Sequence, residues 1–501
     1  MIKSNGGIIG PDNVTTGGSF GRASGVFKLG EVTNLIKDSK WPTAGPGGFQ
    51  VANSCRFNSA SSDALTKTLG SGGNRKTFTI SLWTKPSSVS QQQMFISADS
   101  NQFGFDNTGI IFFYENNGGT EKPYVRWSPQ YRDTGAWYHV CLAIDTTQGT
   151  ASNRMKLYVN GSQVTDTISA TYPDQNQDLT WNTNVAHAIG RYSGSGGHYD
   201  GYMSEIMLIN GSALAPTSFG EFNSQTGIWI PKDVSGLTPG TNGFYLDFKD
   251  SANLGNDAFG GTDWAEVNLT SLDQSTDTCT TNFATANSIG AQRIGGGSIR
   301  PTAYSEGSLR VVLGSSQYYT RATSTIAVPT GKWYWETKMI SNCDSSADPT
   351  IGIIGTDGMQ SSQTGTSPNS SMQYRYNGQK GYNNVGNASY GATWTNGDII
   401  GIALDLTSAT KTITFYKNGT TQGVAFSGDG TSDGFNPASQ YWSAFWVAGG
   451  SNNATMDINM GSPAYAISSG NTDGNGFGNF EYAPPTGFLS LNTKNLAAVL
   501  A

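Results

Sequence analysis

The chain has 501 residues, of which 36% are apolar, 13% are charged and 65 are glycine, and its net charge at pH 7 is −7. This length predicts about three domains, and the scarcity of Glu, Lys and Arg disfavours long exposed helices, whereas Thr, Ser, Asn and Gly suit strands and turns. There is no basic run, no signal-peptide core at the N-terminus and no apolar stretch near the ~20 residues of a membrane helix, so we expect an all-β soluble protein, made in a cytoplasm, with no nucleic-acid partner and no membrane insertion.

Residues 1–47 are rich in glycine and weakly periodic, and they predict an extended arm that folds only against another protein. From 48 to 232, strand signals follow one another closely, and the run 78–83 alternates apolar and polar residues as a half-buried strand does. The run 155–159 leads into Asn160-Gly161, the dipeptide that best suits a tight hairpin turn. This segment therefore predicts a β-sandwich or jelly roll.

Residues 233–300 are polar, with Pro, Gly, Asp and Thr, and predict an irregular connector. Residues 301–465 predict a second sandwich, because the strand-like run 412–416 again leads into an Asn-Gly turn, here Asn418-Gly419. The tail, 466–501, ends in a short apolar segment and is interpreted as a docking segment. In both sandwiches a buried strand ends at an Asp and a later strand leads into a hairpin, which indicates two antiparallel sandwiches of related architecture.

Few residue patterns in the sequence would support catalysis. The four cysteines, Cys55, Cys141, Cys279 and Cys343, have neither CxxC nor metal-ligand spacing and are interpreted as reduced thiols. His139 and His187 lie in or beside predicted strands and are interpreted as packing residues. A glycosidase needs two facing carboxylates, and no short acidic pattern of that kind is present. We therefore expect no enzymatic activity.

Three groups of residues carry resemblances to known families. The first domain resembles laminin G-like, concanavalin A-like jelly rolls through the runs 137–140, 156–161, 189–191 and 201–206. The second resembles a SPRY domain, which is also a concanavalin-like sandwich, through 331–336, 397–401, 404–405, 415–419 and 423–426. Segments 7–11, 242–248, 254–257 and 484–493 resemble linkers of phage structural proteins, notably from marine and cyanobacterial phages. This last resemblance implies a location in the virion.

Loop aromatics are the candidate ligand-binding residues, because a planar ring can cover the apolar face of a sugar. In the first domain these candidates, with one loop histidine, are Trp127, Trp181, Tyr192, His198 and Tyr199. SPRY modules bind partners through loops at one edge, which implies a second group at Tyr374, Tyr376, Tyr382 and Tyr390. For all of them, core or subunit packing is the alternative interpretation.

Laminin G-like modules often hold calcium at the sandwich rim through Asp and Asn oxygens. That resemblance makes Asp99, Asp106 and Asn107 weak calcium candidates, although they lack a dense carboxylate cluster and turn formation explains them as well. No other cofactor is expected.

The combined interpretation is a bacteriophage virion protein, such as a tail fibre or receptor-binding appendage, that recognises a host surface glycan or protein. Its expected partners are other virion proteins and further copies of itself, most plausibly in a trimer whose contacts involve residues 244–248 or 477–500. The alternatives are a capsid decoration or other architectural subunit, and a glycan-degrading virion enzyme.

Overall fold

The computed structural model describes residues 48–289, 303–314, 320–359, 370–428, 439–449 and 452–500, with gaps at 71, 118–119, 195, 225 and 383–384, and the isolated segments 9–10, 25–26, 293–294, 297–298, 301 and 435. Of the predicted N-terminal arm, 1–47, only β1 (Ile9–Gly10) and β2 (Gly25–Val26) are among these residues, and they pair antiparallel. The rest of the chain divides into two compact units, Gly45–Asn282 and Phe283–Ala501. We name them the N-terminal and the C-terminal sandwich.

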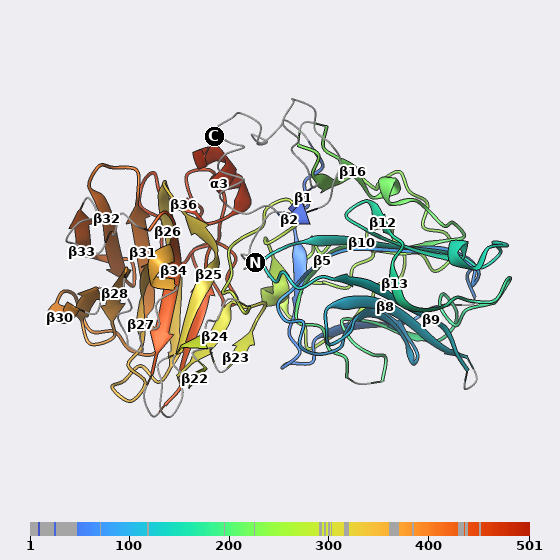
Figure 1. Cartoon of the computed structure of the whole chain (residues 1–501), viewed down its shortest axis with the longest axis horizontal. Coiled ribbons are helices and arrows are strands. Elements are labelled where there is room, and N and C mark those ends of the chain that lie inside the picture. The colour runs from blue at the N-terminus through green and yellow to red at the C-terminus, as the bar shows by residue number, and fades with distance from the viewer. Residues whose placement is uncertain are drawn as a thin grey trace. The chain divides into compact units, whose positions relative to one another are not determined.

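The N-terminal sandwich consists of two eight-stranded antiparallel sheets, with a small hairpin of β16 (Gly220–Phe222) and β17 (Trp229–Pro231). Figure 1 labels β5, β10 and β12 in one layer and β8, β9 and β13 in the other. Sheet A has the order β12 (Ser162–Val164), β11 (Met155–Val159), β10 (Tyr138–Asp145), β5 (Thr77–Pro86), β15 (Gly201–Asn210), β3 (Ser54–Phe57) and β20 (Gln274–Ser275), and β18 (Phe244–Leu246) also pairs with β15. Sheet B has the order β13 (Thr167–Thr171), β9 (Thr120–Gln130), β8 (Ile110–Asn117), β7 (Asn101–Phe105), β6 (Gln93–Ala98), β14 (Ala186–Ile189), β4 (Ala64–Thr68) and β19 (Ala265–Val267).

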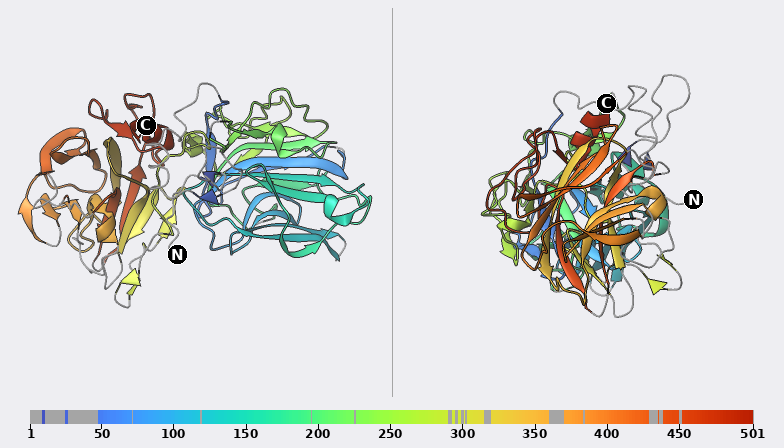
Figure 2. Two further views of the ribbon diagram at one scale, coloured as in Figure 1. Left: turned by 45° about the horizontal axis from the view of Figure 1, so that its top comes forward. Right: turned by 90° about the vertical axis from the view of Figure 1, so that its left-hand side faces the viewer.

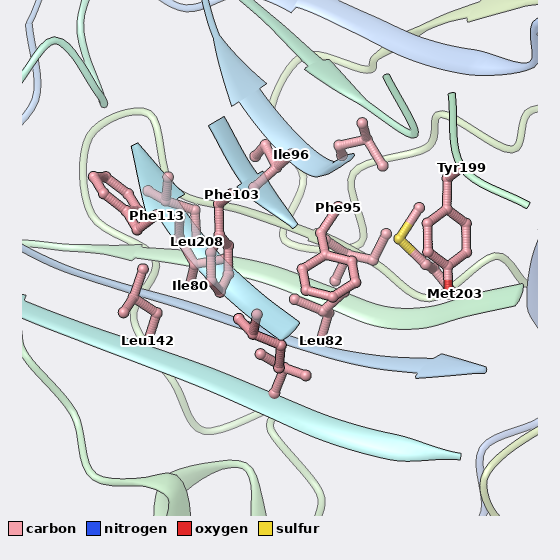
Figure 3. Close-up of a cluster of buried hydrophobic side chains, with 14 of the residues drawn as sticks. Ile80, Leu82, Phe95, Ile96, Phe103, Phe113, Leu142, Tyr199, Met203 and Leu208 are labelled. Atoms are coloured by element: carbon pink, nitrogen blue, oxygen red, sulfur yellow. The ribbon is translucent and has the colours of Figure 1, made fainter. Parts of the chain in front are cut away.

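The apolar core of this unit lies between the two sheets. Alternate residues of each strand point inward, so Ile80 and Leu82 of β5 meet Phe103 of β7 and Phe113 of β8 in one buried cluster (Figure 3). Each large apolar side chain buried in this way stabilises the fold by ~1.5–3 kcal/mol. The opposite face of each strand is left for other contacts.

The C-terminal sandwich also has two sheets (Figure 2). Sheet C has the order β23 (Ala303–Ser305), β24 (Arg310–Leu313), β35 (Ala454–Asn459), β26 (Lys332–Ser341), β31 (Ile399–Asp405), β32 (Lys411–Lys417) and β33 (Thr420–Gly428), and β36 (Leu489–Ser490) pairs parallel with β26. Sheet D has the order β25 (Thr320–Val328), β34 (Trp442–Ala448), β27 (Thr350–Gly355), β28 (Ser371–Arg375), β29 (Gln379–Tyr382) and β30 (Val385–Ser389). The described residues of this unit also include two short α-helices, α2 (Thr356–Met359) and α3 (Thr493–Leu500). The prediction of an all-β protein with two antiparallel sandwiches is confirmed.

The two predicted Asn-Gly hairpins have the same local geometry. Asn160 and Asn418 have φ values of +47° and +46°, which asparagine tolerates better than most residues. In each hairpin the asparagine side chain accepts a hydrogen bond from a backbone N–H of the neighbouring strand, His139 in one and Ile399 in the other, at 2.8 Å. The repeated pattern in the sequence therefore corresponds to a repeated hydrogen-bonded turn.

The segment predicted as an irregular connector, 233–300, is in part a component of the first sandwich. Its first part belongs to the N-terminal sandwich, because β18 adds to β15 of sheet A and β19 adds to β4 of sheet B. Phe244 and Leu246 are fully buried in the core, and Phe248 is 2% exposed. These residues therefore stabilise their own unit, and their burial leaves little of their surface for the expected contacts between copies.

The C-terminal tail, 466–501, also packs on its own sandwich. Phe480 is fully buried against Tyr334 and Ala403 of sheet C. The buried carboxylate of Glu336 accepts hydrogen bonds from the backbone N–H groups of Tyr482, at 2.8 Å, and Glu481, at 3.1 Å. Asp473 similarly binds the Ser490 N–H and hydroxyl. The tail is thus docked on its own sandwich. Phe480 lies in the segment expected to form contacts between copies, but it is already buried within its own unit.

Candidate binding face

The outer face of sheet B presents aromatic and polar side chains on rigid strands. On β8, Phe113 points into the core, so its neighbour Tyr114 points outward, and on β9 the same alternation places Val125 inside and Tyr124 outside. Both tyrosines are half-buried. The strands therefore hold two partly accessible phenol rings on the face opposite to the core.

The strand register aligns these residues in one row across the sheet. Tyr114 lies opposite Tyr124 on one side and opposite Gln102 of β7 on the other. The complete row consists of Thr171, Tyr124, Tyr114, Gln102, Ser97, Ala188, Thr66 and Ala265. We name it the central row.

The two tyrosines pack edge to face, with their ring centroids 5.5 Å apart and their planes at 88°. The Tyr114 hydroxyl donates to the Glu121 carboxylate at 3.3 Å. Burial, and then the charge of Glu121, raise the pKa of Tyr114, so this hydroxyl stays protonated and can donate at neutral pH. The packing fixes both rings, so the protein would lose less side-chain entropy when a ligand binds.

Beside this row, Arg126 of β9 lies opposite Phe112 of β8, which in turn lies opposite Gly104 of β7. The Arg126 guanidinium donates to Asp106 at 2.6 Å. A side chain at Gly104 would lie 2.0 Å from the Gln93 carbonyl oxygen, so only glycine fits there. The face therefore combines a paired arginine with the tyrosines.

The loop from Arg191 to His198 crosses β6 and bounds this surface. The Met94 N–H donates to the Gly197 carbonyl at 2.9 Å, and the Ser97 hydroxyl donates to the Arg191 carbonyl at 2.9 Å. The Gln102 amide donates to the Tyr192 hydroxyl and accepts from Gln92 at 2.8 Å. Tyr192 is thus joined to the central row.

Beyond this loop, an open groove of about 400 Å³ lies over the other end of the central row. Its lining residues are Thr66, Lys67, Thr68, Ala186, His187, Ser193, Asp263 and Ala265. Burial lowers the pKa of Lys67, although Asp257 and Asp263 oppose this effect, and its ammonium donates to the Thr262 carbonyl at 2.5 Å. The loop therefore separates two accessible parts of one face, the tyrosines and the groove.

Family comparisons match both sandwiches. Residues 58–217 match the laminin G model described as the concanavalin A-like lectin/glucanases superfamily, and residues 332–448 match the SPRY domain model. The chain contains a laminin G-like domain and a SPRY domain. No curated protein matches the chain.

Several solved structures are similar to parts of the chain. The SPRY domain of human HERC1 is 18% identical, with a TM-score of 0.25, and the match covers 30% of this chain and 87% of that one. A human SPRY domain is 14% identical, with a TM-score of 0.23 and coverage of 32% and 94%. The heptameric SAP-like pentraxin from Limulus polyphemus is 18% identical, with a TM-score of 0.26 and coverage of 33% and 80%. At this similarity these structures say nothing further about what the chain binds.

Three of the predicted sugar-binding aromatics of the laminin G-like domain are core residues. Trp127 is 2% exposed, and Trp181 and Tyr199 are fully buried (Figure 3 labels Tyr199). Their expected role as stacking residues is wrong, because their rings fill space between the sheets. Tyr192 and His198 are half-buried in the loop that bounds the face. Those two keep a position where a ligand could reach them.

Two of the four predicted tyrosines of the SPRY domain, Tyr374 and Tyr390, pack on each other. Tyr374 is fully buried, packs edge to face on Tyr390 at 5.2 Å, and donates a hydrogen bond to the Ala392 carbonyl. Tyr382 packs on Phe426 at 6.0 Å. Tyr376, Tyr382 and Tyr390 are half-buried and could contact a partner. Tyr374 is fully buried and cannot.

The calcium candidates do not converge. The Asp106 carboxylate accepts from the Thr108 N–H and hydroxyl, the Ile110 N–H and Arg126, which occupies both oxygens. Although burial raises its pKa, these hydrogen bonds outweigh burial and lower it. Asp99 and Asn107 are exposed, and the described residues contain no group of three His, Cys, Asp or Glu side chains that could hold a metal ion. Asp106 is a turn residue that pairs with arginine.

Two acids have strongly raised pKa values, but neither forms a catalytic pair. Burial raises the pKa of Glu115 to about 7, and one of its oxygens accepts from the Thr180 N–H at 3.0 Å. Burial also raises the pKa of Glu205 to about 7, and its carboxyl accepts from the Tyr245 hydroxyl at 2.6 Å. Both side chains are less than 5% exposed, so they act within the fold.

The sequence interpretation missed Tyr114, Tyr124 and Gln102. Their signal was present in the alternation of β8 and β9, where each tyrosine adjoins an inward apolar residue. The pairing of β7, β8 and β9 brings them together, and that pairing is not visible in any one strand. Among described helices, none is long and apolar enough to cross a membrane.

Proposed function

We propose that the laminin G-like domain binds a glycan on the outer face of sheet B. The observation that carries this proposal is the fixed pair of half-buried tyrosines beside Gln102 in the central row. The apolar face of a pyranose packs on such rings, while amides and hydroxyls exchange hydrogen bonds with its hydroxyl groups. Because these side chains lie on paired strands, their positions are set before the ligand arrives.

The proposed activity is recognition without cleavage. Hydrolysis of a glycoside needs an acid and a second carboxylate on either side of the bond, ~5–9.5 Å apart. Glu115 and Glu205, whose pKa values are raised to about 7, are buried. The described carboxylates on the face already have partners: Asp106 binds Arg126, Glu121 binds Tyr114, and Asp263 in the groove accepts from Asn253. Because these carboxylates are either buried or already hydrogen-bonded, the face favours binding of a glycan over its hydrolysis.

We further propose that the chain acts on a phage particle, as a tail fibre or receptor-binding appendage. This part rests on the sequence resemblance of segments such as 242–248 and 484–493 to phage linkers. Assembly with other virion proteins, and into a homo-oligomer such as a trimer, would multiply weak glycan contacts through avidity. Since 244–248 and Phe480 are buried within their own units, the contacts between copies must use other surfaces.

A glycan array probed with the full-length chain tests the binding function. We expect the wild-type chain to bind a set of polysaccharides, and Tyr114→Ala to weaken every one of them. Tyr158→Ala, which removes a half-buried tyrosine of β11 in the other sheet, is the matched control and should bind as the wild type does. A chain that binds no glycan, or a Tyr114→Ala variant with unchanged binding, contradicts the proposal.

A further inference from the structure

Among the described residues, none pairs with the guanidinium of Arg191. Its Nε is buried, and within the described part of the chain no hydrogen bond or ion pair reaches its guanidinium. The other arginines described in this domain have hydrogen-bond or ion-pair partners, such as Asp273 for Arg56 and Asp106 for Arg126. Arg191 is half-buried, and of its nitrogens only Nε is buried without a partner among the described residues. The rest of the guanidinium therefore stays available to an anion from solvent.

His198 lies close to this charge. Its Nδ1 is also buried without a partner among the described residues. Burial, and then the positive charge of Arg191, lower the pKa of His198, and Asp200 opposes them. Both side chains are half-buried, so their accessible nitrogens can reach a ligand: the guanidinium donates, and the imidazole donates or accepts according to its tautomer.

Asp200 does not serve as the missing partner. Its carboxylate accepts from the Ser59 N–H and the Ser59 hydroxyl, each at 2.7 Å, and from the Gln91 amide at 3.2 Å. These bonds hold it on the segment that follows β3. The carboxylate nearest in sequence is therefore committed elsewhere.

The loop that carries Arg191 lies between the two accessible parts of the face. The residue after Arg191, Tyr192, joins the central row through Gln102, and the next, Ser193, lines the groove. A polymer that crosses from the tyrosines to the groove must pass over this loop. That position suits a contact to a substituent of the polymer.

We propose that Arg191 and His198 form an anion subsite, and that the glycan bound by this face is an acidic polysaccharide with carboxylate or sulfate groups. The inference rests on the proposed function and specifies its ligand class. The planar fork of a guanidinium matches the two oxygens of a carboxylate or sulfate, and such charge-assisted bonds are about twice as strong as neutral ones. In a chain of net charge −7, an unpaired cation at this place selects acidic ligands locally while the rest of the surface repels them.

The test uses the full-length chain and matched polysaccharides. The probes are dextran, carboxymethyl dextran and dextran sulfate, together with polygalacturonate and its methyl ester, and the variants are Arg191→Gln and Lys232→Gln. Lys232 is exposed, so its substitution removes the same charge away from the loop. We expect the wild type to bind the acidic member of a pair about tenfold more tightly, Arg191→Gln to lose about that factor, and Lys232→Gln to change less than twofold.

A stability measurement separates a ligand contact from a structural role. Because Arg191 is unpaired, Arg191→Gln should melt at the wild-type temperature or above it, whereas a structural arginine would lower the melting temperature. Equal affinity for acidic and neutral members, equal losses in both variants, or a destabilised Arg191→Gln protein would each overturn the anion subsite and leave the glycan-binding function standing. A wild-type chain that binds none of the probes and nothing on the array would overturn both.

Discussion

Tyr114 and Tyr124 face each other across neighbouring strands, and the edge of one ring meets the face of the other. Each ring is held by its partner and by the strand that carries it, so the pair is a fixed surface and not a mobile loop feature. This relationship distinguishes the two residues from the loop aromatics that the sequence interpretation favoured.

The first prediction separates the ring of Tyr114 from its hydroxyl. Tyr114→Ala should weaken glycan binding about tenfold, because ring stacking with a sugar is lost. Tyr114→Phe keeps the ring and loses only the bond to Glu121, so its affinity should stay within about twofold of the wild type. Titration calorimetry with the best array ligand measures both. Equal losses in the two variants would assign binding to the hydroxyl and would contradict stacking.

The second prediction concerns pH and Glu205. Its pKa is raised to about 7 in the folded protein, so between about 4.5 and 7 the unfolded chain loses a proton that the folded chain keeps, and stability falls as pH rises through this window. Glu205→Gln removes that dependence while an oxygen remains for the Tyr245 hydroxyl. The variant should therefore gain stability relative to the wild type from pH 4.5 to 8, by at most about 3 kcal/mol.

Urea unfolding at the two pH values measures this difference. The buried histidines, whose pKa values are lowered, contribute the opposite slope, but they are the same in both proteins and cancel in the comparison. A constant difference between Glu205→Gln and the wild type across the window would show that Glu205 titrates normally.

The third prediction concerns Glu336 and the tail. Its two oxygens accept from the N–H groups of Glu481 and Tyr482, so the amide of Glu336→Gln would point N–H donors at other donors. We expect a loss of at least about 2 kcal/mol in stability of the C-terminal sandwich and faster proteolysis after residue 466. Glu481→Gln is the control, because this half-buried side chain contacts Ser468 and not Glu336. Its amide can still accept from the Ser468 N–H and donate to the Ser468 hydroxyl, so this variant should be cut no faster than the wild type.

The fourth prediction concerns calcium. Because the oxygens of Asp106 are already bound by Thr108, Ile110 and Arg126, EDTA should leave the melting temperature unchanged. Asp106→Ala should cost about 1–3 kcal/mol through the lost turn and ion pair, and Asp99→Ala should cost little. Differential scanning calorimetry with and without calcium distinguishes the cases. A calcium-dependent rise in melting temperature that Asp106→Ala abolishes would restore the metal site.

The fifth prediction is the absence of turnover. Incubation with any polysaccharide that the chain binds should release no reducing ends, since no accessible pair of carboxylates flanks the described face. Release that a single Asp or Glu substitution abolishes would establish an enzyme instead.

Much of the fold could be predicted from the sequence. The runs 78–83, 155–159 and 412–416 lie within β5, β11 and β32, because long alternating or apolar runs beside an Asn-Gly turn leave few alternatives. The run 243–248 is strand-like in the sequence and contains β18, but the pairing of β18 with β15 and of β19 with β4 could not be predicted, because it depends on strands elsewhere in the sequence. The binding face escaped prediction for the same reason: its row of side chains comes from separate strands, and register is a property of their pairing.

The contact between Glu336 and Tyr482 spans 146 residues, and it also sets an order of events on the ribosome. Synthesis supplies the N-terminal sandwich with all of its strands once Asn282 has been made, so this unit can fold while translation continues. The C-terminal sandwich must wait until its last residues have emerged, because the carboxylate of Glu336 and the ring of Tyr334 lack their partners until then. Any ribosomal pause before residue 482 therefore leaves a folded laminin G-like domain joined to a sandwich with an uncovered sheet. The C-terminal half of the nascent chain is the part that would need a chaperone.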